Sequence, residues 1–168
     1  MQAAIDVQDQ KQAFRNAMAA VPAPVHVITT DGVAGKGGIT ITAFTAITDE
    51  PPTVLVCLNK NSYAASLVLQ NKHLAINTLH AEMTECAGRF AGIGKLSMPE
   101  RFVHTEGWAP LKSGCPTLPE ALAVFDCEVH RVEEMGTHYL IFCRVIETQD
   151  RSEQPGLLYH NRTYKKAV

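Results

Sequence analysis

Hydrogen-bond donors gather at one point in the sequence, in the four residues Asn59, Lys60, Asn61 and Ser62. They follow an apolar run and precede a helical pattern, so Asn61 or Ser62 would cap the new helix. The first N–H groups of a helix attract anions, and Lys60 adds a positive charge at the same place. The sequence therefore predicts an anion-binding position at residues 59–62.

Two more residues have side chains suited to binding or catalysis. Arg89 closes a helical segment, where its planar guanidinium could hold a phosphate in a bidentate manner or simply interact with the helix dipole. His138 follows Gly136 at a turn between two strands, which would hold its ring at the rim of a sheet. A single histidine in a turn is commonly only solvated, so position alone leaves both interpretations open.

The stretch from Gly38 to Ser62 must position these groups. Residues from Ile39 to Thr48 alternate, as in a half-buried strand, with one apolar face and one hydroxyl face. The apolar face holds Ile39, Ile41, Ala43 and Ile47, and the other holds Thr40, Thr42 and Thr48. Asp49, Glu50, Pro51 and Pro52 then form a corner, and Thr53 to Leu58 restarts as a second strand.

The remaining periodicities predict short helices and further strands. Helices are expected over Asp9–Ala20, with Phe14, Ala17, Met18 and Val21 as the apolar stripe, Tyr63–Gln70 and Ala81–Phe90. Strands are expected over Val25–Thr30, His73–Leu79, Ala123–Val132 and Tyr139–Ile146. Within Ala123–Val132, Phe125, Cys127 and Val129 should point inward and Asp126, Glu128 and His130 outward. The segment from Gly92 to Gly114 has little periodicity and is interpreted as a long surface excursion that covers a site.

Strands dominate and no regular alternation of strand and helix occurs, which indicates a mostly antiparallel barrel with short peripheral helices. The 168 residues, 46% of them hydrophobic, are enough for one domain, with residues 1–12 as a flexible N-terminal extension. The strand Tyr139–Ile146 is apolar on both faces, which predicts that a second subunit covers it.

Composition and motifs exclude several classes of protein. The net charge of −2 and scattered basic residues argue against a nucleic-acid partner. Five cysteines without a C-x-x-C pair indicate neither a disulfide framework nor a zinc site, and they are interpreted as core residues. No metal-ligand spacing, phosphate loop or G-x-G-x-x-G motif is found. No signal peptide or span of about 20 apolar residues is found, so no membrane association and a cytoplasmic location are expected.

Several short motifs occur together in a characteristic order. The threonine-rich strand is followed by D-E-P-P at 49–52, N-K-N-S at 59–62, R-F-A-G at 89–92, G-T-H at 136–138 and L-Y-H-N-R-T-Y at 158–164. From about Phe14 to Tyr164 the chain thus resembles the short-chain flavin reductases, the reductase components of two-component flavin-dependent monooxygenases such as the 4-hydroxyphenylacetate and chlorophenol types.

The resemblance implies a fold, an activity and partners. It implies a six-stranded Greek-key split β-barrel that binds FMN or FAD and works as a homodimer with a flavin at each interface region. The implied activity is hydride transfer from NADH or NADPH to the flavin, which is then supplied in reduced form to a partner monooxygenase. Two rivals share the barrel: a non-catalytic flavin- or haem-binding protein, and an oxidase of the pyridoxine-phosphate type, for which no substrate-phosphate cluster is found.

The resemblance also implies site residues. The flavin ring and ribityl chain would contact Thr42, Ala43, Phe44 and Thr45, and ribityl and phosphate oxygens would contact Asn59, Lys60 and Ser62. Arg89 would bind the phosphate, with Phe90 as a second-rank cofactor contact. Tyr159 and Arg162 would lie near the flavin or the dinucleotide. His138 would lie against the nicotinamide as the catalytic residue; Thr137 stands where the family often has aspartate, so no acid is expected to act there.

Overall fold

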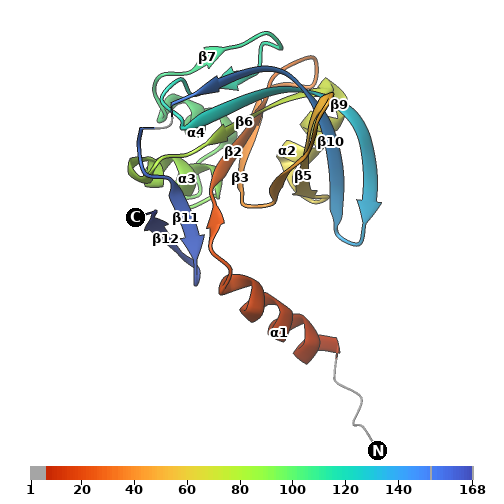
Figure 1. Cartoon of the computed structure of the whole chain (residues 1–168), viewed down its shortest axis with the longest axis vertical. Helices are drawn as coiled ribbons and strands as arrows, with labels where there is room; N and C mark the ends of the chain where they lie inside the picture. Colours follow the sequence, from red (N-terminus) through yellow and green to blue (C-terminus); the bar gives the residue numbers. More distant parts are fainter. Residues whose placement is uncertain (1–6, 152, 168) are drawn as a thin grey trace, which may run out of the picture.

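A sheet of seven antiparallel strands forms the body of the protein, seen in a computed structural model that describes residues 7–151 and 153–167. Its order is β3-β2-β6-β9-β10-β5-β4. The strands are β2 (His26–Thr30), β3 (Gly37–Ile41), β4 (Phe44–Asp49), β5 (Pro52–Asn59), β6 (His73–Thr78), β9 (Ala123–Met135) and β10 (His138–Asp150). The two end strands, β3 and β4, are consecutive in sequence, and the sheet curves into a split barrel (Figure 1).

The expected single strand over Ile39–Thr48 is wrong, because residues 42 and 43 divide it into β3 and β4. Phe44 N donates to Thr42 O at 3.0 Å, which closes a tight turn at the break. Ile47 was expected to point inward, but its side chain is 49% exposed. A register shift between Ala46 and Thr48 changes the alternation of β4 at this residue. The hairpin of β4 and β5 around the Pro-Pro corner is confirmed.

One hydrophobic core fills the barrel. Its buried side chains come from the strands and from helix α2 (Tyr63–Asn71), which packs against β2, β3 and β6. Of the two predicted caps of this helix, Asn61 and Ser62, the structure has Ser62, whose hydroxyl accepts a hydrogen bond from Ala65 N at 3.2 Å. Because the helix begins directly after β5, the polar residues 59–62 lie at the barrel rim.

A second core lies outside the barrel, under the 3-10 turn η1 (Ala81–Met83) and the helices α3 (Thr84–Phe90) and α4 (Met98–Val103). The ring of Phe90 packs edge-on against Phe102 at 5.1 Å and Trp108 at 5.8 Å between centroids. Gly38 permits this packing, since a Cβ there would lie 2.8 Å from the Phe90 ring. The segment Gly92–Gly114 is therefore not only a surface excursion: it contains α4 and supplies two aromatic core residues.

Asp126 departs from its expected outward position. It is fully buried, because residues 111–117, with the short pair β7 (Ala109–Pro110) and β8 (Pro116–Thr117), fold over this part of β9. Its carboxylate accepts hydrogen bonds from the backbone N–H of Ser113, at 2.7 Å, and from the Ser113 hydroxyl. Strands β9 and β10 form the expected hairpin, with Gly136 at φ 55° in the turn.

The segment that follows α1 (Val7–Ala19) pairs with the C-terminal hairpin beside the barrel. Strands β1 (Ala23–Pro24), β11 (Leu157–His160) and β12 (Thr163–Lys166) form a small sheet, and α1 projects from it (Figure 1). The predicted apolar stripe of α1 does not pack on this subunit, because Phe14 is 65% and Met18 52% exposed. Of the expected flexible extension, residues 1–6 lie outside the described residues, and residues 7–12 are helical. None of the helices described is long and apolar enough to cross a membrane.

Candidate active site

A cavity of about 790 Å³ opens where the barrel is split. Four parts of the chain enclose it: the crossover from β3 to β4, the end of β5 with the start of β10, the residues after α3, and the β11–β12 hairpin. Its walls are Val25, Ile39, Thr40, Ile41, Thr42, Ala43, Cys57, Asn59, Ala91, Ile93, His138, Tyr159, Arg162, Thr163 and Tyr164. None of these residues is acidic, and several aliphatic side chains alternate with polar ones.

Six of the predicted site residues line this cavity: Thr42, Ala43, Asn59, His138, Tyr159 and Arg162. Strand pairing explains part of this arrangement. His138 and Asn59 are register partners of β10 and β5, which places the turn histidine opposite the donor cluster. Ala43 O accepts a hydrogen bond from Cys57 N at 3.0 Å, which ties the crossover to the same strand.

Two hydrogen bonds of Thr137 fix the imidazole of His138 and the short turn that carries it. The Nδ1 of His138 lies 2.9 Å from the hydroxyl of Thr137. The carbonyl of Thr137 in turn accepts a hydrogen bond from Lys60 N at 3.0 Å. The turn is thereby fixed to the rim of the barrel.

Four predicted residues lie near the cavity without lining it. The ammonium of Lys60 forms an ion pair with Glu134 and lies 5.5 Å from the Tyr139 ring centroid. Ser62 uses its hydroxyl as the helix cap. Phe44 packs its ring against His26 and Phe125, at 4.7 and 5.4 Å between centroids. Thr45 is exposed on the edge strand β4.

Arg89 and Phe90 lie on the far side of the cavity wall. Arg89 forms an ion pair with Glu85 at 2.8 Å and lines a neighbouring hollow of about 340 Å³. Ile93 and Tyr164 belong to both hollows, so Arg89 is separated from the main cavity by those two side chains. Phe90, in contrast, is 1% exposed within the second core and lines neither of the two hollows.

Nine of the lining residues were not among the predicted site residues, and Cys57, Tyr164 and Ile93 are three of them. Cys57 was interpreted as a core residue but is only half-buried, and its thiol, whose pKa is raised by burial, is expected to stay neutral near pH 7. The alternation of β5 carries the signal, since Val54, Val56 and Leu58 fill the barrel on the opposite face. Tyr164 pairs with Tyr159 across the β11–β12 hairpin, with ring centroids 5.4 Å apart. Ile93, at 65% exposure, follows α3 where no periodicity indicated a role.

The cavity combines aliphatic and tyrosine walls with an amide, an imidazole and a guanidinium at its margins. Such a lining suits a flat aromatic ring that carries a polar, negatively charged chain. Among the described residues, no group of three histidine, cysteine, aspartate or glutamate side chains is placed to hold a metal ion. Binding and alignment of an organic ligand is therefore the chemistry that these side chains favour.

Residues 18–167 match the family model of the flavin reductase like domain, so the chain belongs to the flavin reductase family. The FMN reductase (NADH) RutF of Acinetobacter baylyi is 44% identical over 158 residues, which cover 94% of this chain and 82% of that protein.

Solved structures agree with this assignment. The NADH:FAD oxidoreductase SgcE6 of Streptomyces globisporus, in complex with NAD and FAD fragments, is 25% identical with a TM-score of 0.86, over 99% of this chain and 98% of that one. Nitrilotriacetate monooxygenase component B from Mycobacterium thermoresistibile is 26% identical with a TM-score of 0.85, over 95% and 87%.

Proposed function

We propose that the protein is an NADH-dependent FMN reductase that passes reduced flavin to a flavin-dependent monooxygenase in the cytoplasm. The observation that carries the proposal is the 790 Å³ cavity, where His138, Asn59 and the β11–β12 hairpin converge on a slot without acidic residues. The RutF relative supports FMN and NADH as the reactants, and the monooxygenase component supports the partner. A flavin- or haem-storage role is less well supported, since the named relatives are reductases.

The lining residues suggest how a flavin would lie. Ile39, Ile41 and Tyr164 offer apolar surface to the ring, and Thr42 and Asn59 offer hydrogen bonds to its polar edge or to the ribityl chain. Lys60, Ser62 and Arg89 remain the candidates for binding the phosphate. To do so, Lys60 would have to break its ion pair with Glu134, and Arg89 its ion pair with Glu85. Phe90 is left out of the proposed site because its ring is enclosed in the core.

The protein contributes alignment rather than acid–base chemistry. When bound, the flavin supplies the electron chemistry by accepting a hydride from the nicotinamide. His138 and Asn59 then act by holding two rings at reacting distance, and the aliphatic walls exclude water from between them. No covalent nucleophile is needed, in agreement with the buried Cys127 and Cys143, whose thiols are kept neutral because burial raises their pKa values, that of Cys143 to about 12.

The test is NADH oxidation by the purified protein with FMN added. A reductase turns over many equivalents of FMN, whereas a storage protein would bind flavin and leave NADH unchanged. A flavin-dependent monooxygenase that accepts free reduced FMN can then be added to the assay. Hydroxylation of its substrate should depend on the presence of this protein. Flavin binding without NADH oxidation would contradict the proposal.

His138→Ala is expected to raise the KM for NADH and to slow flavin reduction by about tenfold or more, because a positioning contact is lost. Flavin affinity should stay near the wild-type value, since the alanine adds no clash. Stopped-flow reduction of FMN at several NADH concentrations measures the rate of flavin reduction and its saturation with NADH. The matched control is His130→Ala, a histidine on β9 that does not line the cavity and should leave the rates unchanged. If both variants behave alike, His138 is an ordinary turn histidine.

We also propose that the protein is a homodimer. On the outer face of β5 and β10, Leu55 opposes Phe142 and Cys57 opposes Leu140, and all four side chains remain partly exposed. Arg131 stacks on Phe142, with its guanidinium carbon 4.3 Å from the ring centroid. Light scattering at micromolar concentration should give twice the mass of one chain, 18.3 kDa, and Phe142→Asp should shift the protein towards that single-chain mass. A wild-type monomer would refute the dimer.

A further inference from the structure

A buried histidine that the proposed mechanism does not use lies beside the split of the barrel. His26 is the first residue of β2, and its side chain is only 1% exposed. Along this strand Val27 packs in the second core and Ile28 in the barrel core. Because neighbouring residues of a strand face opposite ways, the imidazole of His26 points into the barrel together with Ile28. A polar ring therefore stands among apolar side chains.

His26 contacts the chain on both sides of the crossover at residues 42 and 43. Its register partner on β3 is Ile41, the last residue of that strand. Its ring packs against Phe44, the first residue of β4, with the centroids 4.7 Å apart and the planes tilted by 58°. One residue thus adjoins the positions immediately before and immediately after the crossover, and a movement of its ring would be passed on to Phe44.

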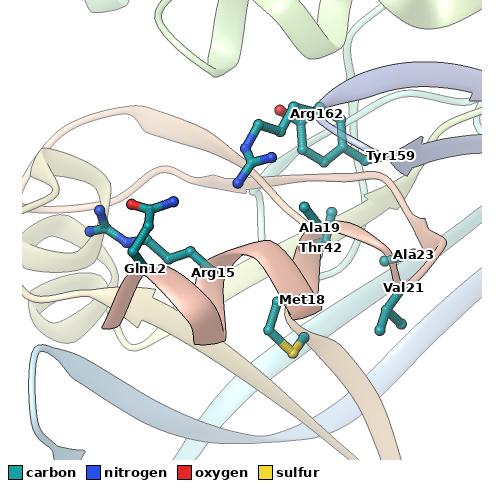
Figure 2. A pocket seen from close by; sticks show the side chains of 9 residues that line it. All are labelled: Gln12, Arg15, Met18, Ala19, Val21, Ala23, Thr42, Tyr159 and Arg162. Carbon is teal, nitrogen blue, oxygen red and sulfur yellow. The ribbon is translucent and has the colours of Figure 1, made fainter. Parts of the chain in front are cut away.

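The crossover itself is part of the cavity wall. Thr42 and Ala43 line the candidate active site, and Ala43 O accepts the hydrogen bond from Cys57 N. Thr42 also lines a second hollow, of about 540 Å³, between α1 and the β11–β12 hairpin, together with Arg15 and Arg162 (Figure 2). A small displacement of the crossover would therefore change the walls of both spaces.

The hydrogen bonding of the His26 ring is incomplete. Its Nδ1 lies 3.0 Å from the hydroxyl of Thr78, the register partner on β6. Its Nε2 is buried and has no hydrogen-bond partner in the part of the chain that the structure describes. A buried polar atom without a partner costs stability, and leucine would fill the barrel without this cost. Such a cost beside a binding cavity is typical of a residue that serves function rather than stability.

From this placement we propose that His26 is a positioning residue of the flavin site. Anchored on Thr78, its ring supports Phe44 and thereby holds the crossover at the position that leaves the cavity open. His26 acts through Phe44, because it is not itself among the residues that line the cavity. The proposal rests on the proposed reductase function, since it assigns the crossover residues to the flavin.

His26→Leu tests this role, because leucine fills the barrel but carries neither the flat ring nor the bond to Thr78. The KM for FMN should rise about fivefold, as for the loss of one hydrogen bond, while kcat at saturating FMN stays near the wild-type value. Ile28→Val is the matched control, since it shortens a buried side chain on the same face of β2, away from the crossover. It should leave both constants unchanged.

A double-mutant cycle tests whether Phe44 transmits the effect. Phe44→Leu should weaken FMN binding about as much as His26→Leu does, because it removes the ring that His26 supports. The double variant should bind FMN no more weakly than either single variant, since all three lack the same contact. Fluorescence titration of FMN measures the affinities, and it applies to Phe44→Leu even if the leucine at position 26 impairs folding.

Hydrogen exchange gives a readout that does not depend on activity. The amide of Cys57 donates to Ala43 O at 3.0 Å, so its exchange reports whether the crossover stays in place. In His26→Leu this amide should exchange about fivefold faster than in the wild type, because the crossover opens more often. The amide of Val129, which donates to Lys72 O elsewhere in the barrel, should exchange at the same rate in both proteins.

An unchanged KM for FMN in His26→Leu, additive effects of the two substitutions, or unchanged exchange of the Cys57 amide would each overturn the proposal. Those results leave the reductase function intact, because the wild-type protein still oxidises NADH when FMN is present. Failure of the reductase function is seen in the wild type alone, which would then leave NADH unchanged. The exchange measurement still decides whether His26 holds the crossover in that case.

Discussion

Phe90→Ala is expected to lower the free energy of unfolding by about 3–5 kcal/mol, the range for removing a large aromatic side chain from a packed core. The ring is 1% exposed and touches both Phe102 and Trp108, so its loss leaves a cavity that neither neighbour can fill without moving. Urea unfolding followed by tryptophan fluorescence measures the change, since Trp108 belongs to the same cluster.

Phe90→Leu distinguishes a core role from a cofactor contact. Leucine keeps most of the apolar volume, so the stability loss should be clearly smaller than for alanine, and the affinity for FMN should equal that of the wild type. A stable leucine variant that binds FMN weakly would show instead that the ring contacts the flavin. That result would return Phe90 to the proposed site.

The stability of the protein should also fall by about 3 kcal/mol as the pH drops from about 6.5 to about 4, on account of His26 alone. Burial lowers the pKa of His26 from 6.5 to about 4. The side chain is 1% exposed, its Nε2 has no hydrogen-bond partner, and its ring packs against Phe44. Only Nδ1 is paired, with the Thr78 hydroxyl at 3.0 Å, so a charged imidazolium would be poorly solvated there.

The direction follows from the two states. The unfolded chain takes up a proton on this residue near pH 6.5 and the folded chain only near pH 4, so protons favour the unfolded state between those values. The contribution of His26 to stability is therefore complete above pH 6.5, declines below it and levels off below the folded pKa. Protonation of His26 on its own cannot stabilise the fold at any pH.

His26→Leu provides the comparison, because leucine fills the barrel but does not titrate. Urea unfolding of both proteins across this pH range gives a difference in stability from which the other titrating groups largely cancel. The difference between wild type and variant should shift by about 3 kcal/mol in favour of the variant on acidification. Parallel stability curves would show that His26 titrates normally and is accessible to water.

Local features of this chain could be predicted from the sequence because each depends on neighbouring residues. The cap at Ser62, the Pro-Pro corner after β4 and the turn at Gly136 are short-range events of side-chain hydrogen bonding, proline sterics and glycine backbone freedom. The antiparallel class and the flavin reductase motifs followed from patterns of the same range. Among the proposed site residues, Asn59 is the last residue of β5 and His138 is the first residue of β10. The two residues face each other because these antiparallel strands pair there.

Only the tertiary structure decided which side chains share a space. Alternation placed Asp126 on an outer face, but a loop from residues 111–117 buries it and supplies its hydrogen bonds. Cys57 reads as a core residue, and it faces the cavity because the crossover at residues 42 and 43 leaves the barrel open beside it. Arg15 joins Arg162, almost the whole chain apart in sequence, because the N-terminal helix ends against the C-terminal hairpin. Such contacts depend on closure of the barrel over long sequence separations, and no local pattern of residue types encodes them.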